Sequence, residues 1–409
     1  STLSSSSAAS DVYKRQLHPG FRQLLLITEA AKKFGVNNPY FNLHQGIAGA
    51  TTEIGDKEYI NFSSYNYLGL NGHPYVKEAA KKAIDSYGTS VSASRPVSGE
   101  RPVHRDLEKG IADCYNVDNA IAFVSGHATN VTTIGYLFGN KDLILHDELS
   151  HNSILQGALL SGARRLSFPH NDWEGLDAVL SKQRIHFERV LIVVEGIYSM
   201  DGDYPELPGF IEVKKRHRAF LMVDEAHSFG VMGKTGMGIR EHFGLEGGAV
   251  DIWMGTLSKA LAGCGGFIAG EHALIDHLKF LAPGFLYSVG MSPPVAAASL
   301  AALQFIKREP ERVVTLQKRG EFFLRLAKSA GINTGNSAGL AVIPAIIGNS
   351  LKTARVSAAL FEQGINVQPI LYPAVPEKSA RLRFFISCQH TESQIQKTVD
   401  LLAKELSRL

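Results

Sequence analysis

Short apolar segments alternate with helical segments through the middle of the chain. Between residue 61 and about residue 294, four β-rich runs are almost continuously apolar: residues 120–124, 143–146, 190–194 and 220–223. Strands buried on both faces show this unbroken pattern, whereas half-buried strands alternate apolar and polar positions. The segment therefore predicts an α/β fold, in which helices cover both faces of a mainly parallel sheet.

The pattern changes towards the C terminus. Residues 340–347, 366–370 and 381–387 resemble strands, whereas 353–363 and 392–406 resemble helices. The last helix is marked by Thr391 and Gln394 at capping-box spacing, followed by an apolar stripe. We therefore predict a flexible serine-rich tail at 1–16, a segment at 17–60 packing on the smaller domain, a large domain at 61–294 and a small α+β domain at 295–409.

Charge and cysteine content exclude several classes of protein. The net charge is +3, from 42 basic and 39 acidic residues, with no basic block of the kind that nucleic-acid binders carry. The three cysteines are far apart in the sequence, which argues against a disulfide framework and a structural zinc site. The longest aliphatic run, 190–194, is far shorter than the ~20 residues of a membrane span. We expect a cytoplasmic protein.

Reactive side chains directly follow two of the predicted strands. Asp224 ends one apolar run, with His227 three residues later, and Glu195 ends another, with Ser199 four residues later. In open parallel sheets, ligands bind in the crevice outside the carboxyl ends of the strands. We therefore expect these four side chains to face one crevice. Taken alone, Asp224 is equally explained as the cap of a turn.

Two further segments carry candidate chemistry. Lys259 lies among small and hydroxyl residues before a glycine-rich run, where an amine of lowered pKa can form an imine. On a surface loop it would only be solvated. Ser125 and Gly126 turn the run 120–124 into a helix whose free N–H groups can bind phosphate.

Two other patterns lack an essential part of the motif they suggest. Gly233-Lys234-Thr235 ends like a P-loop, but Ser228 stands where that motif requires glycine. His146 and His151 lack the spacing of the zinc-binding H-E-x-x-H motif. The sequence therefore predicts neither a nucleotide triphosphatase nor a metal site.

The order of these motifs along the chain resembles that of the α-oxoamine synthases, which are pyridoxal-5′-phosphate (PLP) enzymes of fold type I. The matching residues are Asn66 in the segment 61–69, Ser94 to Gly99, Asp147 with His151, Glu195 with Ser199, Asp224 with His227, Thr256-x-Ser258-Lys259, and Arg381-x-Arg383. The resemblance extends from about residue 20 to the C terminus. It implies a large PLP-binding domain with a smaller C-terminal domain, in a homodimer with active sites at its interface.

The resemblance also implies individual roles. Lys259 would attach PLP and then remove the α-proton of the substrate, while Asp224 would keep the pyridine nitrogen protonated. His227 would hydrogen-bond the phenolic oxygen, and His151 would stack on the ring. Arg383 would clamp the carboxylate of the amino acid, unless it is only a surface charge. The remaining implied contacts are Ser125, Gly126, His127, Glu195, Ser199, Thr256 and Ser258 for the cofactor, and Asn66 for the substrate.

The expected reaction joins an amino acid to an acyl thioester, with loss of CO₂, to give an α-amino ketone. Residues 89–96 and 282–288 are similar to members attached to polyketide assembly lines, whose acyl group comes from a carrier protein instead of coenzyme A. An aminotransferase or amino-acid lyase would use the same lysine and aspartate, and would release product without consuming a thioester. A non-catalytic binding module is disfavoured, because the lysine, the acid and the stacking histidine are all present.

Overall fold

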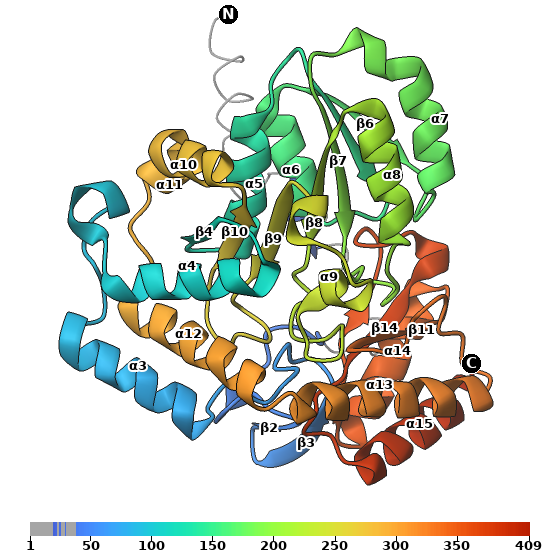
Figure 1. The fold of residues 1–409 in the computed structure, drawn as a ribbon. Coiled ribbons are helices and arrows are strands. Elements are labelled where there is room, and N and C mark those ends of the chain that lie inside the picture. Colours follow the sequence, from blue (N-terminus) through green and yellow to red (C-terminus); the bar gives the residue numbers. More distant parts are fainter. Residues whose placement is uncertain (1–18, 23, 26–28, 30–37) are drawn as a thin grey trace, which may run out of the picture.

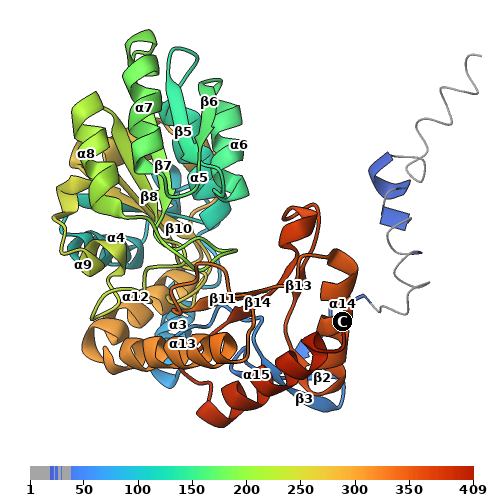
Figure 2. The same ribbon diagram turned by 90° about the vertical axis from the view of Figure 1, so that its right-hand side faces the viewer.

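The computed structural model describes residues 19–22, 24, 25, 29 and 38–409. The predicted tail at 1–16 lies outside the described residues, as does much of the segment 17–37. Figures 1 and 2 show a larger part built around one sheet and a smaller part that contains the C terminus. No described helix is both long and apolar enough to cross a membrane.

A seven-stranded sheet forms the frame of the larger part. Its strand order is β4-β10-β9-β8-β7-β5-β6, and β6, β5, β7, β8 and β9 pair in parallel. This confirms the predicted α/β architecture. The bounds are β4 (Asn119–Phe123), β5 (Leu143–Asp147), β6 (Arg164–Phe168), β7 (Val190–Glu195), β8 (Phe220–Asp224), β9 (Ile252–Thr256) and β10 (Gly266–Gly270).

One strand differs from the sequence-based prediction. The run 120–124 was expected to pair in parallel, but β4 lies at the sheet edge and pairs only with β10, which is antiparallel to it. The sequence does not reveal β10 as a strand because β10 begins within a glycine-rich run. Close packing explains why one of these residues is glycine. A Cβ on Gly266 would lie 2.8 Å from the Gly126 Cα and 2.4 Å from the Thr129 Oγ1. Glycine therefore lets the start of helix α5 (Gly126–Leu137) approach the strand backbone.

Successive residues of the strands feed two separate hydrophobic cores. Ile192 and Val194 of β7 pack into one core, whereas Leu191 and Val193 pack into the other. This alternation explains the unbroken apolar runs, since each face of the sheet meets helices. One face is covered by α4 (Pro102–Tyr115), α7 (Trp173–Gln183) and α8 (Leu207–His217), and the other by α5, α6 (Asn152–Ser161), α10 (His272–Leu281) and α11 (Pro283–Leu286) (Figure 1).

The smaller part combines strands from both ends of the described chain. One sheet has the order β1-β2-β3-β12 and the other β11-β14-β13. The predicted strand 366–370 is wrong in one respect: it divides, and its first half joins β3 while its second half joins β14. The bounds are β1 (His44–Gln45), β2 (Thr51–Ile54), β3 (Lys57–Asn61), β11 (Val342–Ile346), β12 (Ile365–Asn366), β13 (Pro369–Ile370) and β14 (Arg381–Phe385).

Helices complete the smaller part and connect it to the larger one. The final helix follows the prediction for 392–406, and the Thr391 and Gln394 side chains form the expected capping box. The expected helix at 353–363 begins earlier, because Asn349 caps it. The predicted domain boundaries stay predictions. The bounds are α3 (Pro74–Tyr87), α9 (Gly238–His242), α12 (Pro293–Arg308), α13 (Glu311–Ser329), α14 (Ser350–Glu362) and α15 (Glu392–Leu406).

Replacing Gly202 tests the contact between the loop after β7 and strand β11. Gly202 has φ +71°, and a Cβ there would lie 2.0 Å from the Val342 carbonyl oxygen. For Gly202→Ala we expect a loss of about 2–5 kcal/mol in unfolding free energy, combining left-handed strain with overpacking. The control is Gly55→Ala, which has φ +61° and open space, and should lose only about 1–2 kcal/mol. Equal urea midpoints for the two variants would contradict this reading.

Candidate active site

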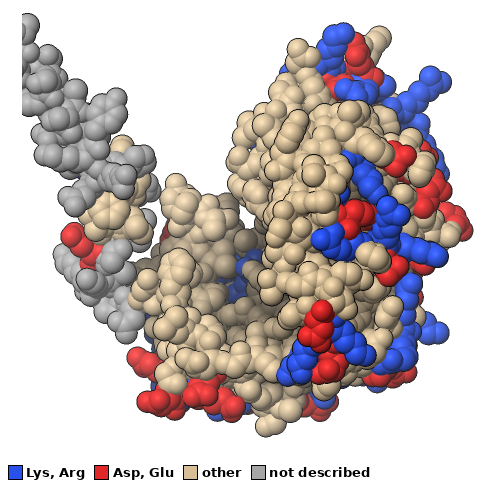
Figure 3. Space-filling view, turned by 90° about the vertical axis from the view of Figure 1, so that its left-hand side faces the viewer, with Lys and Arg blue, Asp and Glu red and all other residues tan. Residues whose placement is uncertain are grey.

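The predicted reactive residues gather in a cavity at the carboxyl ends of β7, β8 and β9. It has a volume of about 350 Å³. Figure 3 shows a hollow between the two parts of the molecule, and few charged side chains lie on the face around it. The predicted residues that line the cavity are Ser125, Gly126, His127, His151, Glu195, Ser199, Asp224, His227, Thr256, Ser258, Lys259 and Arg383.

Asp224 is held in a fixed orientation at the end of β8. Its Oδ2 accepts a hydrogen bond of 2.8 Å from the Asn130 amide, and its Oδ1 accepts one of 2.9 Å from the Ala226 backbone. Asn130 also donates to the Ser153 hydroxyl, at 2.9 Å. Asp224 is buried, so these hydrogen bonds replace the hydration that its carboxylate loses on folding. Asp224 therefore does more than cap a turn, because its side chain also lines the cavity.

Lys259 lies in the loop between β9 and β10, with its amine in the same cavity. Burial lowers the pKa of Lys259 to about 7, with help from Arg383, although Asp224 and Glu195 oppose this shift. The Nζ lies 5.6 Å from the centre of the Tyr65 ring. A large fraction of this amine is therefore neutral near pH 7, which is the form that acts as a nucleophile or base.

The cavity is also lined by His227 and His151, and by a second acid, Glu195. Burial lowers the pKa of His227 well below its usual range, and Lys259 adds to this effect, so the ring is neutral. Burial likewise lowers the pKa of His151, which caps α6. The His151 backbone N–H donates to Glu195, at 2.5 Å. Burial raises the pKa of Glu195 well above its usual range, and Asp224 contributes.

The start of α5 forms a seat for an anion. Ser125 caps the helix, and the N–H groups of Gly126 and His127 have no partner among the described residues. A Cβ on Gly126 would lie 2.9 Å from the Thr256 Oγ1, so glycine lets the helix end approach this hydroxyl. Exposed N–H groups and the helix dipole favour a negative group at this position.

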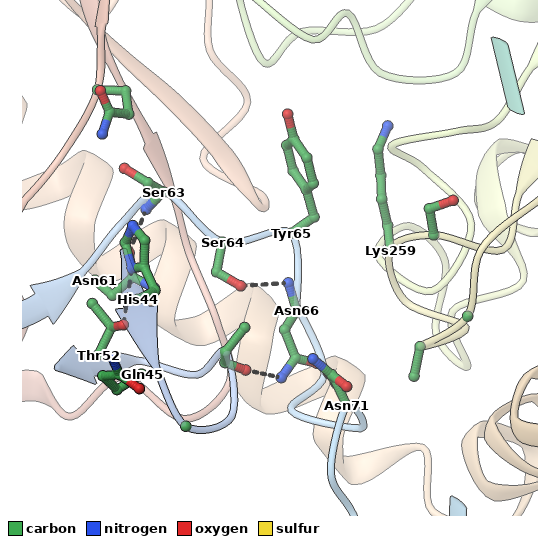
Figure 4. Close-up of a pocket in the computed structure, with 16 residues that line it drawn as sticks. His44, Gln45, Thr52, Asn61, Ser63, Ser64, Tyr65, Asn66, Asn71 and Lys259 are labelled. Carbon is green, nitrogen blue, oxygen red and sulfur yellow. Dashed lines mark hydrogen bonds between the residues drawn. The ribbon is translucent and has the colours of Figure 1, made fainter. Parts of the chain in front are cut away.

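Arg383 and Asn66 occupy different positions relative to the cavity. Arg383 reaches in from β14, donates to the Ser199 carbonyl oxygen at 3.1 Å and leaves its Nε without a partner among the described residues. Asn66 lines an adjoining cavity of about 530 Å³, together with Lys259 and Tyr65 (Figure 4). The Asn66 side chain already bonds the Ala48 carbonyl and the Asn71 backbone N–H. The Asn66 side chain therefore stabilises the loop in which it lies.

The chain is similar to known proteins over most of its length. The sequence profile of the aminotransferase class I and II family matches residues 57–402. An 8-amino-7-oxononanoate synthase of Treponema denticola is 38% identical over 88% of this chain and 91% of its own length, and one of Fervidobacterium nodosum is 39% identical over 87% and 90%.

Solved structures agree with this result. Serine palmitoyltransferase of Sphingomonas wittichii has a TM-score of 0.90 at 28% identity, over 95% of this chain and 98% of its own. A PLP- and myriocin-bound serine palmitoyltransferase of S. paucimobilis has 0.91 at 28%, over 97% and 100%.

The chain is an α-oxoamine synthase. It thus belongs to the aminotransferase class I and II family, and its cofactor is PLP.

The residues present in this α-oxoamine synthase fit PLP. The cofactor has a phosphate, a basic ring nitrogen and an aldehyde. The cavity has a carboxylate, an amine and helix N–H groups that have no partner among the described residues. Asp224 ends β8, Lys259 follows the neighbouring strand β9, and both side chains line this cavity. The donor set therefore matches the cofactor group by group.

A partly buried histidine supports the loops around the site. His170 places its Nδ1 2.9 Å from Asp147 and its Nε2 2.9 Å from Asp203. Burial opposes a charge here, yet hydrogen bonds to the two carboxylates outweigh it and raise the pKa of His170 to about 10. Because Asp147 precedes the loop of His151 and Asp203 follows that of Ser199, His170 ties both loops together.

Sequence reasoning missed four residues near the site: Tyr65, Tyr67, Asn130 and His170. Asn130 had a readable signal, since it lies four residues after Gly126 on the same face of a helix. The other three had none. They lie in loops whose positions relative to β8 depend on tertiary packing.

Lys259 and His170 affect the pH dependence of stability in opposite directions. Below about pH 7 the folded state protonates a buried Lys259, and this cost disappears as the pH rises towards 10.5, the pKa in the unfolded chain. The stabilisation from His170 is complete below about pH 6.5 and is lost as the pH rises through 10.

In the cofactor-free protein these two effects partly cancel between pH 7 and 10. As the pH rises from 7 to 10, we expect the unfolding free energy of Lys259→Met to fall relative to that of the unchanged protein, because the loss at His170 is no longer offset. Over the same range, the unfolding free energy of His170→Asn should rise relative to that of the unchanged protein. Urea denaturation at several pH values measures both slopes. Slopes equal to that of the unchanged protein would refute the assignment.

Proposed function

We propose that this α-oxoamine synthase condenses an amino acid with an acyl thioester to give an α-amino ketone, CO₂ and a free thiol. The observation that carries the proposal is the position of Lys259, whose side chain lines both the cofactor cavity and the adjoining cavity of about 530 Å³. One amine can thus serve the cofactor and a second substrate. The names and similarity of the synthases above support the same reaction class.

Each group of the cavity has a proposed role. When bound, PLP supplies an aldehyde that captures the substrate amine and a ring that accepts electron density from the α-carbon. Asp224 holds a proton at the ring nitrogen, His227 donates to the ring oxygen and His151 packs on the ring face. The start of α5, with Ser125, Gly126, His127, Thr256 and Ser258, would hold the phosphate, and Glu195 and Ser199 would contact the ring.

Three further residues would act on the substrate. Lys259, neutral near pH 7, removes the α-proton of the amino acid. The α-carbon then forms a bond to the thioester carbonyl and the thiolate leaves. Arg383 holds the carboxylate until it departs as CO₂, and the protonated Lys259 then returns its proton to the α-carbon. Asn66 keeps the neighbouring loop in place.

We also propose a homodimer whose interface covers the face around the site. Several large apolar side chains in α10, just after α11 and in the segment 95–99, which contacts α11, are exposed. Such groups commonly mark a protein interface. They are Val97, Phe280, Leu281, Tyr287 and Val289. We further propose a reducing, cytoplasmic environment, which the three free cysteines support.

Lys259→Ala tests the central assignment. Because this amine both attaches the cofactor and moves the proton, we expect loss of the visible absorbance of the attached cofactor and a fall in kcat of more than about 10⁴-fold. Turnover is measured as thiol release from an acyl thioester in the presence of amino acids. Normal turnover by the variant would refute the assignment. Release of a keto acid without thioester consumption by the unchanged enzyme would instead favour an aminotransferase.

Arg383→Lys tests the carboxylate clamp. Lysine keeps the positive charge but loses the two-pronged geometry, so we expect the KM for the amino acid to rise about 10- to 100-fold. The KM for the thioester should change little. The control is Arg381→Lys, two residues away on the same strand, where the partner is Asp201. An equal rise in KM for both variants would show a general disturbance of β14.

A further inference from the structure

Tyr67 makes a buried contact with His227 that none of the proposed chemical steps uses. The Tyr67 hydroxyl lies 2.8 Å from the His227 Nδ1, and Tyr67 is fully buried. The two residues are 160 positions apart in the sequence. Tyr67 follows strand β3, whereas His227 follows strand β8, so the contact joins the smaller part of the molecule to the larger one.

The surroundings determine which atom donates in this hydrogen bond. Phe385 lies parallel to His227 at 6.2 Å between ring centres, and it also lies near Tyr67. The Tyr67 hydroxyl has no other hydrogen-bond acceptor among the described residues. If it accepted from His227, its own proton would be buried without a partner, which is costly. The hydroxyl therefore donates to the Nδ1 of the neutral ring.

We propose that Tyr67 is a positioning residue that fixes His227 as the tautomer with its proton on Nε2, so that an N–H donor faces the cofactor cavity. A neutral imidazole has one donor and one acceptor nitrogen, so a donor at Nδ1 leaves the proton on the other nitrogen. The Nε2 has no partner among the described residues, and His227 lines the cavity. The proposal rests on the role given to His227 above.

The tautomer matters because the ring oxygen of the cofactor carries electron density. An N–H donor stabilises that oxygen, whereas the lone pair of the other tautomer would repel it. In a cavity of low dielectric constant, both effects are stronger than in water. Tyr67 is itself held in place, since its carbonyl oxygen accepts from the Cys388 backbone N–H at 2.8 Å. The chain after β14 thereby helps to position Tyr67, which in turn contacts His227.

Tyr67→Phe removes only the hydroxyl, and the chain offers a matched control. Tyr115 in α4 is also fully buried, but its hydroxyl has no hydrogen-bond partner among the described residues. Tyr115→Phe therefore measures the effect of losing a buried hydroxyl that forms no hydrogen bond with a described residue. For each protein, ¹⁵N chemical shifts of the histidine rings report the tautomer, with the His227 signals assigned by their loss in His227→Asn. Spectra are recorded with PLP bound and after its removal.

In the unchanged protein we expect His227 to carry its proton on Nε2 in both spectra. In Tyr67→Phe we expect mixed tautomers, a fall in kcat of about tenfold, as for one lost hydrogen bond, and unchanged KM values for both substrates. Tyr115→Phe should behave like the unchanged protein. A proton on Nδ1 in the unchanged protein, or an unaltered tautomer in Tyr67→Phe, would overturn the proposal. If PLP does not bind at all, the proposed function fails while the cofactor-free spectra still decide the tautomer.

Discussion

Parallel pairing of β7, β8 and β9 is the constraint on which the site depends. Glu195 pairs in register with Asp224, and Asp224 with Met254, so the ends of three strands lie at one edge of the sheet. Strands β7 and β8 each end in an acid at that edge, Glu195 and Asp224. Lys259 follows within three residues of the end of β9. The register of the sheet thus brings the two acids together, and the start of the loop after β9 adds the amine.

Concentrating charged groups in this way has an electrostatic cost. The cavity removes water from Lys259, Glu195 and His227, and in each case burial is the largest cause of the pKa shift, which favours the neutral form. A neutral amine and a neutral imidazole are the reactive forms that the proposed chemistry needs. The same loss of hydration that destabilises the folded protein therefore prepares the site for catalysis.

A second layer of residues controls the orientation of the first. Asn130 holds Asp224, Tyr67 contacts His227, and His170 ties the loops of His151 and Ser199. Each of these contacts joins segments that are far apart in the sequence. They convert a set of suitable side chains into a cavity with defined donors and acceptors, because each polar group near the cofactor has one preferred direction.

The sequence by itself determined the α/β class, the positions of β4, β5, β7 and β8, the capped final helix and many of the residues that line the cofactor cavity. Apolar runs ended by acids and a lysine before a glycine run are local patterns, and the resemblance to a family supplied the other cavity residues. Tertiary structure alone decided the antiparallel β10, the division of 366–370 between two sheets, the structural use of Asn66 and the contacts of Tyr67 and His170. The reason is physical. Backbone pairing and the partners of buried polar groups depend on which distant segment lies alongside, and no local pattern encodes that neighbour.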